Sequence, residues 1–218
     1  MRNVFFLALA ILFTACGGSP EGQAVEAQDA VETDTKAVDE VMSAGLAIDT
    51  DASMITWVGA KFTGDEHKGT LKLSDGSLDV KDGKLVGGKF TIDMKSMENL
   101  DLPEDKKANL IGHLSDSDFF EVGTYPTAQF SITGVEEAAG DDGATHNITG
   151  NLSMKDITKS ITFPAMVSMA DGAVEASTPQ FTIDRTQWNV KYGSTALGVL
   201  KDEAIDDMIG LVINIATK

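Results

Sequence analysis

Few residues of this chain carry reactive groups, and the most distinctive of them is Cys16, its only cysteine. A single cysteine cannot form an internal disulfide, so an unpaired thiol in an exported protein needs another explanation. A thioether bond to a lipid is one such explanation. Several acyl chains on one residue give stable membrane attachment, because each buried CH₂ contributes about 0.8 kcal/mol. Cys16 is therefore the first candidate for chemistry.

The residues before Cys16 have the features of an export signal. Arg2 precedes an apolar run of ten residues, 4–13, whereas a membrane-spanning helix needs about 20. A basic start, a short apolar stretch and small residues at its end are typical of a signal peptide. Phe13-Thr14-Ala15-Cys16 resembles a lipobox, although Leu is commoner where Phe13 stands. We predict a signal peptide over residues 1–15 and lipid on Cys16; the alternative is an ordinary signal peptide with an incidental cysteine.

The other polar candidates do not form a catalytic set. His67, His113 and His146 are scattered and lack the spacing of metal ligands. The sequence contains no phosphate-binding loop and no Gly-x-Ser-x-Gly elbow. We predict no metal, no cofactor and no enzymatic activity.

Asp184-Arg185 is the most distinctive polar pair. An arginine at the mouth of a pocket suits a phosphate or a quinone oxygen, so Arg185 is a possible head-group contact. The favoured alternative is a structural role, as an ion pair or as a clamp on the backbone at a strand end. His67 is the second possible head-group contact.

The charge of the chain excludes some partners. It has 34 acidic and 17 basic residues, a formal net charge of −17. Nucleic acid is excluded as a partner because its phosphates need Lys and Arg, and adsorption to anionic lipids is disfavoured for the same reason. Membrane attachment is expected through Cys16. Gly17, where an Asp would signal inner-membrane retention, favours the outer membrane, facing the periplasm or the exterior.

Residues 16–45 differ in composition from the rest. From 17 to 44 the segment has no aromatic residue, no Leu and no Ile, and seven acids oppose one base, Lys36. Such a segment buries too little apolar surface to offset its ordering entropy, so we predict a flexible acidic tether. The alternative is a weak helix around 24–42, since Ala and Glu favour helix.

Residues 46–218 are expected to form one domain. Apolar and polar residues alternate over 84–94, 128–133, 148–154, 161–163, 181–183 and 211–215, and residues 54–59 are rich in β-forming types. Alternation means that each strand has one buried face. Turn signals such as Asp82-Gly83 separate the runs, as in antiparallel hairpins.

One segment, 103–114, reads as a short helix. Pro103 and two acids stand at its start, and Leu110, Ile111 and Leu114 fall on one face. Many short antiparallel strands with one helix predict an all-β fold, either a closed barrel or a sandwich. About eight strands would make a barrel wide enough for one small ligand.

Several motifs occur in a fixed order: Leu114–Phe120, Tyr125–Phe130, Gly150–Met154, Ile157–Lys159 and Phe181–Trp188. With Trp57 and His67-Lys68-Gly69, the set resembles the YceI-like family of lipocalin-like, polyisoprenoid-binding proteins over residues 46–218. Many relatives have a second His where Lys68 stands. The resemblance implies an extended antiparallel barrel whose apolar tunnel holds the tail of an isoprenoid lipid or quinone, and it implies no catalytic set.

A flexible apolar tail needs an elongated cavity without unsatisfied polar atoms. Inward strand residues would line it, and the predicted lining residues are Trp57, Phe90, Ile92, Met94, Phe130, Ile132, Leu152, Met154, Phe163 and Phe181. The alternative for each is plain core packing. Phe119-Phe120, after the helix, would either close one barrel end or pack the helix onto the barrel.

The leading hypothesis is a membrane-anchored binding protein that carries, stores or shields an isoprenoid-type lipid in the cell envelope. The alternatives are a filled barrel that acts through its surface, for example in stress tolerance, and an enzyme that acts on such a lipid. The oligomeric state has no signal in the sequence.

Overall fold

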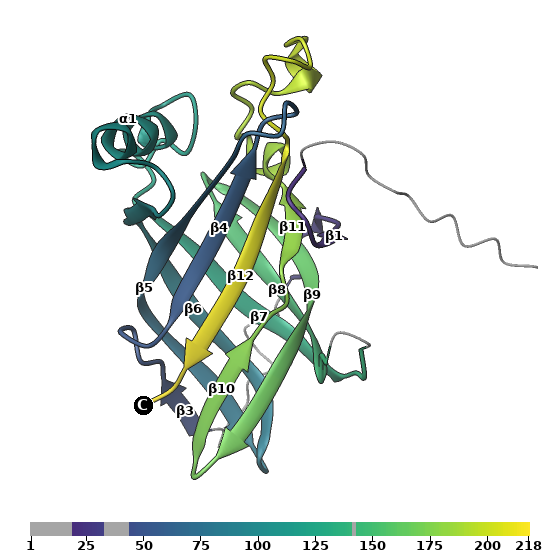
Figure 1. Ribbon diagram of the computed structural model, residues 1–218. Coiled ribbons are helices and arrows are strands. Elements are labelled where there is room, and N and C mark those ends of the chain that lie inside the picture. Colours follow the sequence, from purple (N-terminus) through teal and green to yellow (C-terminus); the bar gives the residue numbers. More distant parts are fainter. Residues whose placement is uncertain (1–18, 33–43, 141–142) are drawn as a thin grey trace, which may run out of the picture.

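The computed structural model describes residues 19–32, 44–140 and 143–218, whose strands close into a ring of antiparallel pairs (Figure 1). Eight strands form the ring: β4 (Met54–Ala60), β5 (Glu66–Lys81), β6 (Lys84–Asn99), β7 (Thr127–Glu137), β8 (His146–Met154), β9 (Ile157–Ala170), β10 (Ala173–Ser177) and β12 (Met208–Ala216). The pairing of β12 with β4 closes the barrel. β11 (Phe181–Asp184) pairs with the first half of β12, and β3 (Ala44–Ala47) with β5. The predicted all-β barrel of about eight strands is confirmed.

β6 illustrates how alternation builds the wall. Phe90, Ile92 and Met94 are buried in the interior, while the residues between them lie on the opposite face. The hairpin from β5 to β6 turns at Asp82 and Gly83, and both have the positive φ that a two-residue hairpin of this type requires. The inward faces of the strands together form one hydrophobic core cluster.

The helix α1 (Glu104–Ser115) lies beside one end of the barrel (Figure 1). It begins after Pro103, within one residue of the prediction, and Glu104 and Asp105 occupy the first turn. Two short 3₁₀ helices, η1 (Arg185–Trp188) and η2 (Thr195–Leu197), lie at the same end and were not predicted. Across the described ranges, no helix is long and apolar enough to cross a membrane.

Residues 19–32, which we call the N-terminal strap, correct part of the tether prediction. β1 (Gln23–Val25) pairs in parallel with β11, and β2 (Gln28–Asp29) pairs with β9. Within the described ranges β9 and β11 do not pair with each other. The strap pairs with both of them and therefore lies between them. Pairing along an open strand edge uses backbone groups and needs few large side chains. A composition argument therefore cannot detect it.

Three predictions for the N-terminal part of the chain lie outside the described residues. These are the signal peptide over 1–15, Cys16 and the middle of the expected tether, 33–43.

Candidate functional site

The barrel interior contains a cavity of about 740 Å³. Its apolar lining comes from inward-facing residues of the ring strands. Of the ten predicted lining residues, nine border the cavity and Ile132 does not. Ile132 lines a separate pocket of about 30 Å³ at the other side of the barrel interior. The hollow interior is what the binding hypothesis requires and what a filled barrel lacks.

Four phenylalanines form a floor to this cavity. Successive ring centroids are 5.3 Å apart for Phe90 and Phe130, 5.5 Å for Phe130 and Phe163, and 4.7 Å for Phe163 and Phe181. Phe90, Phe130 and Phe163 border both the large and the small pocket, so they separate the two. Gly150 makes room for this aromatic floor, because a Cβ there would lie 2.2 Å from Cζ of Phe130.

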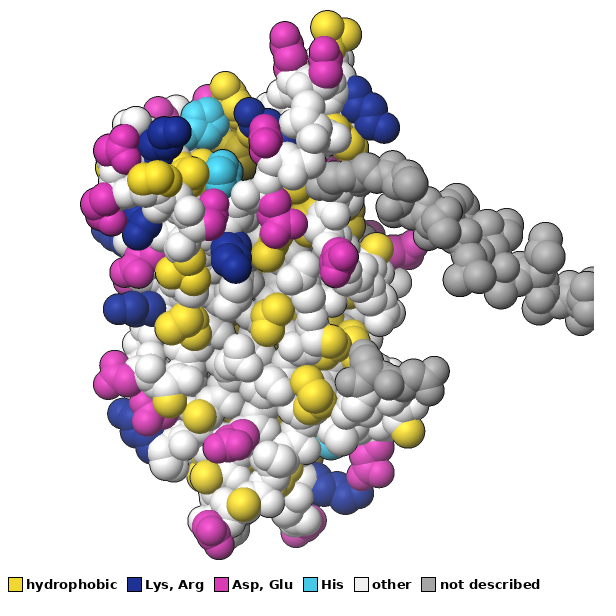
Figure 2. Space-filling view, viewed as in Figure 1, with side chains coloured by type: hydrophobic (Ala, Val, Ile, Leu, Met, Phe, Trp, Pro, Cys, Tyr) yellow, Lys and Arg dark blue, Asp and Glu magenta, His cyan; other side chains and the backbone are white. Residues whose placement is uncertain are grey.

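The cavity opens between three segments at one barrel end: the loop 61–65, residues 100–115 with α1, and residues 185–207. We call these segments the rim. Lys61, Asp65 and Glu203 border the cavity and are also exposed, so the cavity reaches solvent there. Figure 2 shows basic, acidic and histidine side chains gathered at this end of the molecule. The polar groups of the site are therefore concentrated at the mouth.

His67 borders the mouth and is held by Asp101. The His67 Nδ1 lies 2.7 Å from Asp101 Oδ2, while Asp101 Oδ1 accepts from the Lys68 backbone and from the Asn99 amide. Burial alone would raise the pKa of Asp101, but these hydrogen bonds outweigh it and hold that pKa below its usual value. His67 thus has a fixed orientation at the cavity entrance.

Two polar atoms of the lining have no hydrogen-bond partner. Among the described residues, Trp57 Nε1 and His113 Nε2 are buried and unpaired, and both residues border the cavity. The His113 ring lies edge-on to Tyr192, with centroids 4.5 Å apart. A buried polar atom without a partner is costly, so a ligand whose polar end reaches these two nitrogens would be stabilised there.

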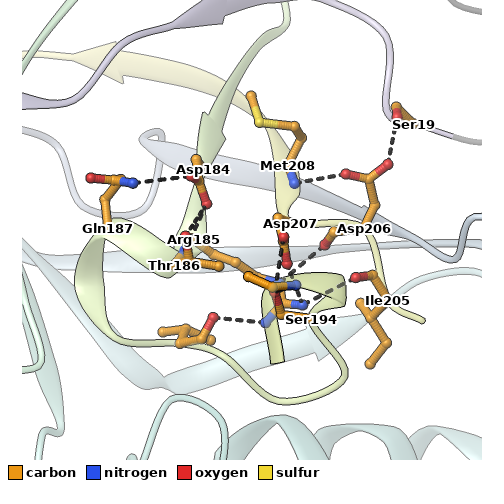
Figure 3. Close-up of polar contacts among 12 residues, drawn as sticks. Ser19, Asp184, Arg185, Thr186, Gln187, Ser194, Ile205, Asp206, Asp207 and Met208 are labelled. Carbon is orange, nitrogen blue, oxygen red and sulfur yellow. Dashed lines mark hydrogen bonds and ion pairs between the residues drawn. The ribbon is translucent and has the colours of Figure 1, made fainter. Parts of the chain in front are cut away.

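Arg185 borders the cavity, but its guanidinium is already bound within the chain (Figure 3). Nε donates to the Asp206 carbonyl at 3.0 Å and Nη1 to the Val190 carbonyl at 2.7 Å. Nη2 donates to the Ile205 carbonyl and lies 3.3 Å from Asp207 Oδ1. Burial lowers the pKa of Arg185, and Asp207 opposes that shift most strongly. These contacts are those of a clamp that joins the two ends of the 185–207 segment.

Of the two structural alternatives for Asp184-Arg185, the structure shows the backbone clamp by Arg185 and no ion pair between the two side chains. The Asp184 side chain accepts from the Thr186 backbone and hydroxyl and from Gln187, and so caps η1. The role of Arg185 as a head-group contact stays a prediction, with one guanidinium N–H left for it.

The sequence profile of the YceI-like domain matches residues 46–217. The chain belongs to the YceI-like family. A UPF0312 protein of Azotobacter vinelandii is 33% identical over 99 residues, which are 44% of this chain and 47% of that protein. A UPF0312 protein of Pseudomonas putida is 34% identical over the same shares. These matches span about half the length of the curated relatives.

Two solved structures share the fold of this YceI-like chain. Burkholderia cenocepacia BcnA has a TM-score of 0.63 at 21% identity and covers 78% of this chain and 99% of its own. A polyisoprenoid binding domain from Saccharophagus degradans has a TM-score of 0.55 at 17% identity, with 79% and 97% covered. At these identities the likeness shows the common fold.

Some residues of this YceI-like site escaped the sequence argument. His113 and Tyr192 border the cavity from α1 and the 185–207 segment, where no period-two pattern marks them. Trp188 is fully buried and donates to the Leu152 carbonyl at 3.0 Å, which fixes η1 to β8. Phe119, by contrast, is a residue for which the sequence predicts either closure of a barrel end or packing of the helix onto the barrel. It is buried against His113 and Arg185, which is the packing role, and it also borders the cavity.

In the parts of the chain that the structure describes, no three His, Cys, Asp or Glu side chains cluster as metal ligands.

Proposed function

We propose that this YceI-like chain is a lipid-anchored envelope protein that binds an isoprenoid-type lipid or quinone in its barrel. The apolar cavity of about 740 Å³ carries the proposal. It falls within the range of about 300–1,000 Å³ common to small-molecule sites. Its deep part is aromatic and aliphatic, which suits a tail without polar atoms.

The distribution of polar groups indicates which way the ligand lies. The aromatic floor excludes a polar end, while Trp57 Nε1, His113 Nε2 and His67 lie toward the mouth. A ligand with an apolar tail and one oxygen-bearing end would place the tail inward and the oxygen at the rim. A polyisoprenoid-binding relative of the same fold supports this ligand class. The proposal assigns the protein to carriage, storage or shielding, with no catalytic step.

The direct test is native mass spectrometry of the secreted chain from residue 17 onward, with organic extraction of the same sample. The N-terminal strap must be kept because it forms part of the wall. We expect a stoichiometric adduct that extracts as a polyprenyl compound or quinone. An apo mass that persists after incubation with such lipids would refute lipid binding.

A pair of neighbouring substitutions makes the test specific. Ile92→Trp adds bulk inside the cavity, whereas Thr91→Trp adds the same bulk on the outer face of β6. We expect the adduct to be lost in Ile92→Trp and kept in Thr91→Trp. Loss in both, or in neither, would mean that the ligand does not occupy the cavity.

The anchor is tested separately by labelling cells with a clickable fatty acid. We propose that Cys16 carries the lipid and that the protein resides at the outer membrane. Label should appear on the wild type and be absent from Cys16→Ser, and membrane fractionation should place it with the outer membrane. Equal labelling of both proteins would refute the anchor.

A further inference from the structure

The N-terminal strap is fixed to the barrel along its course. Pro20 is buried, and the Gln180 side chain donates to the Glu21 carbonyl. At the far end, the Asn151 amide donates to the Val31 carbonyl at 2.8 Å and accepts from the Val31 N–H at 3.0 Å. Strand pairing with β11 and β9 joins the two ends. The strap is therefore not free to swing away from the wall as a tether would.

The strap starts at the rim. The Ser19 hydroxyl donates to the Asp206 carboxylate (Figure 3), and Asp206 borders the cavity. Cys16 is three residues earlier in the chain, so covalent geometry allows at most about 11 Å between the Cα atoms of Cys16 and Ser19. A free tether of about 30 residues would instead span about 30 Å on average. A lipid on Cys16 would thus lie beside the cavity mouth.

The same end of the barrel exposes large apolar side chains. Within the described residues, the three most exposed large hydrophobics are Leu200 at 66%, Leu197 at 64% and Leu100 at 54%, and all three belong to the rim. Tyr192, also on the rim, is 42% exposed. Figure 2 shows hydrophobic side chains at the tip of this end. Exposed apolar groups beside a lipid attachment point suit insertion among lipid headgroups.

We propose that the rim docks on the bilayer that holds the anchor, with Leu197 and Leu200 inserted and the cavity mouth facing the membrane. The inference rests on the proposed lipid at Cys16. Because the chain carries a net charge of −17, attraction to anionic lipids does not contribute, and the partner surface is a zwitterionic one. In this orientation an isoprenoid-type lipid passes between bilayer and cavity without crossing water.

The test uses the mature lipidated protein, which begins at Cys16, in phosphatidylcholine vesicles. Since the sulfur of Cys16 is in a thioether, one introduced cysteine is the only free thiol. A fluorophore is placed at Leu197→Cys on the rim or at Asp171→Cys, in the turn between β9 and β10 at the opposite end. Nitroxide-labelled phosphatidylcholine should quench the label at position 197 and leave that at 171 unchanged. Equal quenching, or quenching at 171 alone, would overturn the proposal.

A matched pair of insertions tests the role of the strap. Twenty Gly/Ser residues inserted after residue 18 lengthen the link between anchor and rim, while the same insertion after residue 38 does not. We expect quenching at position 197 to fall only with the first insertion. An unchanged signal with both would overturn the strap's role.

Flotation with the vesicles separates the two proposals. A chain that fails to float has no lipid anchor, which would refute both the anchor on Cys16 and the docking of the rim. A chain that floats but shows no difference between positions 197 and 171 keeps its anchor and loses only the docking orientation.

Discussion

Replacement of Arg185 by Met distinguishes a structural clamp from a ligand contact. Met keeps an apolar side chain of similar length but removes bonds to three carbonyls and to the Asp207 carboxylate. Arg185 is fully buried, and the Asp207 side chain is 23% exposed, so the carboxylate would keep its charge with little solvent. Removing one partner of a buried ion pair costs about 3–5 kcal/mol. Because Asp207 is partly solvated, we expect the lower end, about 3 kcal/mol.

Urea unfolding followed by tryptophan fluorescence measures this loss. With a slope of about 2 kcal/mol per M, the expected loss lowers the unfolding midpoint by about 1.5 M. Arg185→Lys is the control, because it keeps the charge but loses the planar fork that reaches several carbonyls. We expect its midpoint to lie between those of wild type and Arg185→Met.

The outcome that would refute this reasoning is a loss below about 0.5 kcal/mol, the size of an ordinary surface substitution. If such a variant also lost its lipid adduct, Arg185 would be a head-group contact and not a clamp. An adduct kept by the folded Arg185→Lys protein would agree with the clamp.

Three further predictions follow from single contacts. Gly150→Ala should disturb the aromatic floor and destabilise the protein by about 1–3 kcal/mol, whereas Gly134→Ala, with 3.6 Å to the nearest atom, should be tolerated in thermal unfolding. Because the folded pKa of Asp101 is lowered, its contribution to stability is present above pH 3.8 and is lost as the pH falls through the folded pKa. Asp101→Asn should therefore be less stable than wild type at pH 7 and equally stable near the acid limit of an unfolding series; a constant difference would contradict this. Asn151→Ala should speed amide hydrogen exchange in the strap, while Asn147→Ala on the same strand should not, and equal rates would mean that the Asn151 contacts do not hold it.

Period-two alternation predicts the barrel and most of the cavity lining correctly, because each inward position is set by its own strand. Phe90, Ile92 and Met94 are examples, and the pattern places them inside without reference to other strands. The same alternation cannot distinguish a hollow barrel from a filled one. That depends on how inward side chains from opposite walls meet.

Long-range contacts explain the features that the sequence does not reveal. The strap is apolar at only a few positions, yet the open edges of β9 and β11 supply its partners. Three acids, Asp184, Asp206 and Asp207, lie near Arg185. Only the fold shows that its guanidinium binds the Asp207 carboxylate and backbone carbonyls. In both cases the structural role is determined by a partner that is distant in the sequence, so the residue type alone does not predict it.

The contact between Ser19 and Asp206 spans 187 residues of chain, which has a consequence for the order of synthesis. The strap emerges first, but its partner β11 is among the last strands to be made. Contacts between distant parts of a chain form late, because their loop-closure entropy must be offset by contacts already present. The strap, residues 19–32, is therefore expected to stay unpaired until β11 and β12 have been made. Docking of the strap would then follow as a late step of barrel closure.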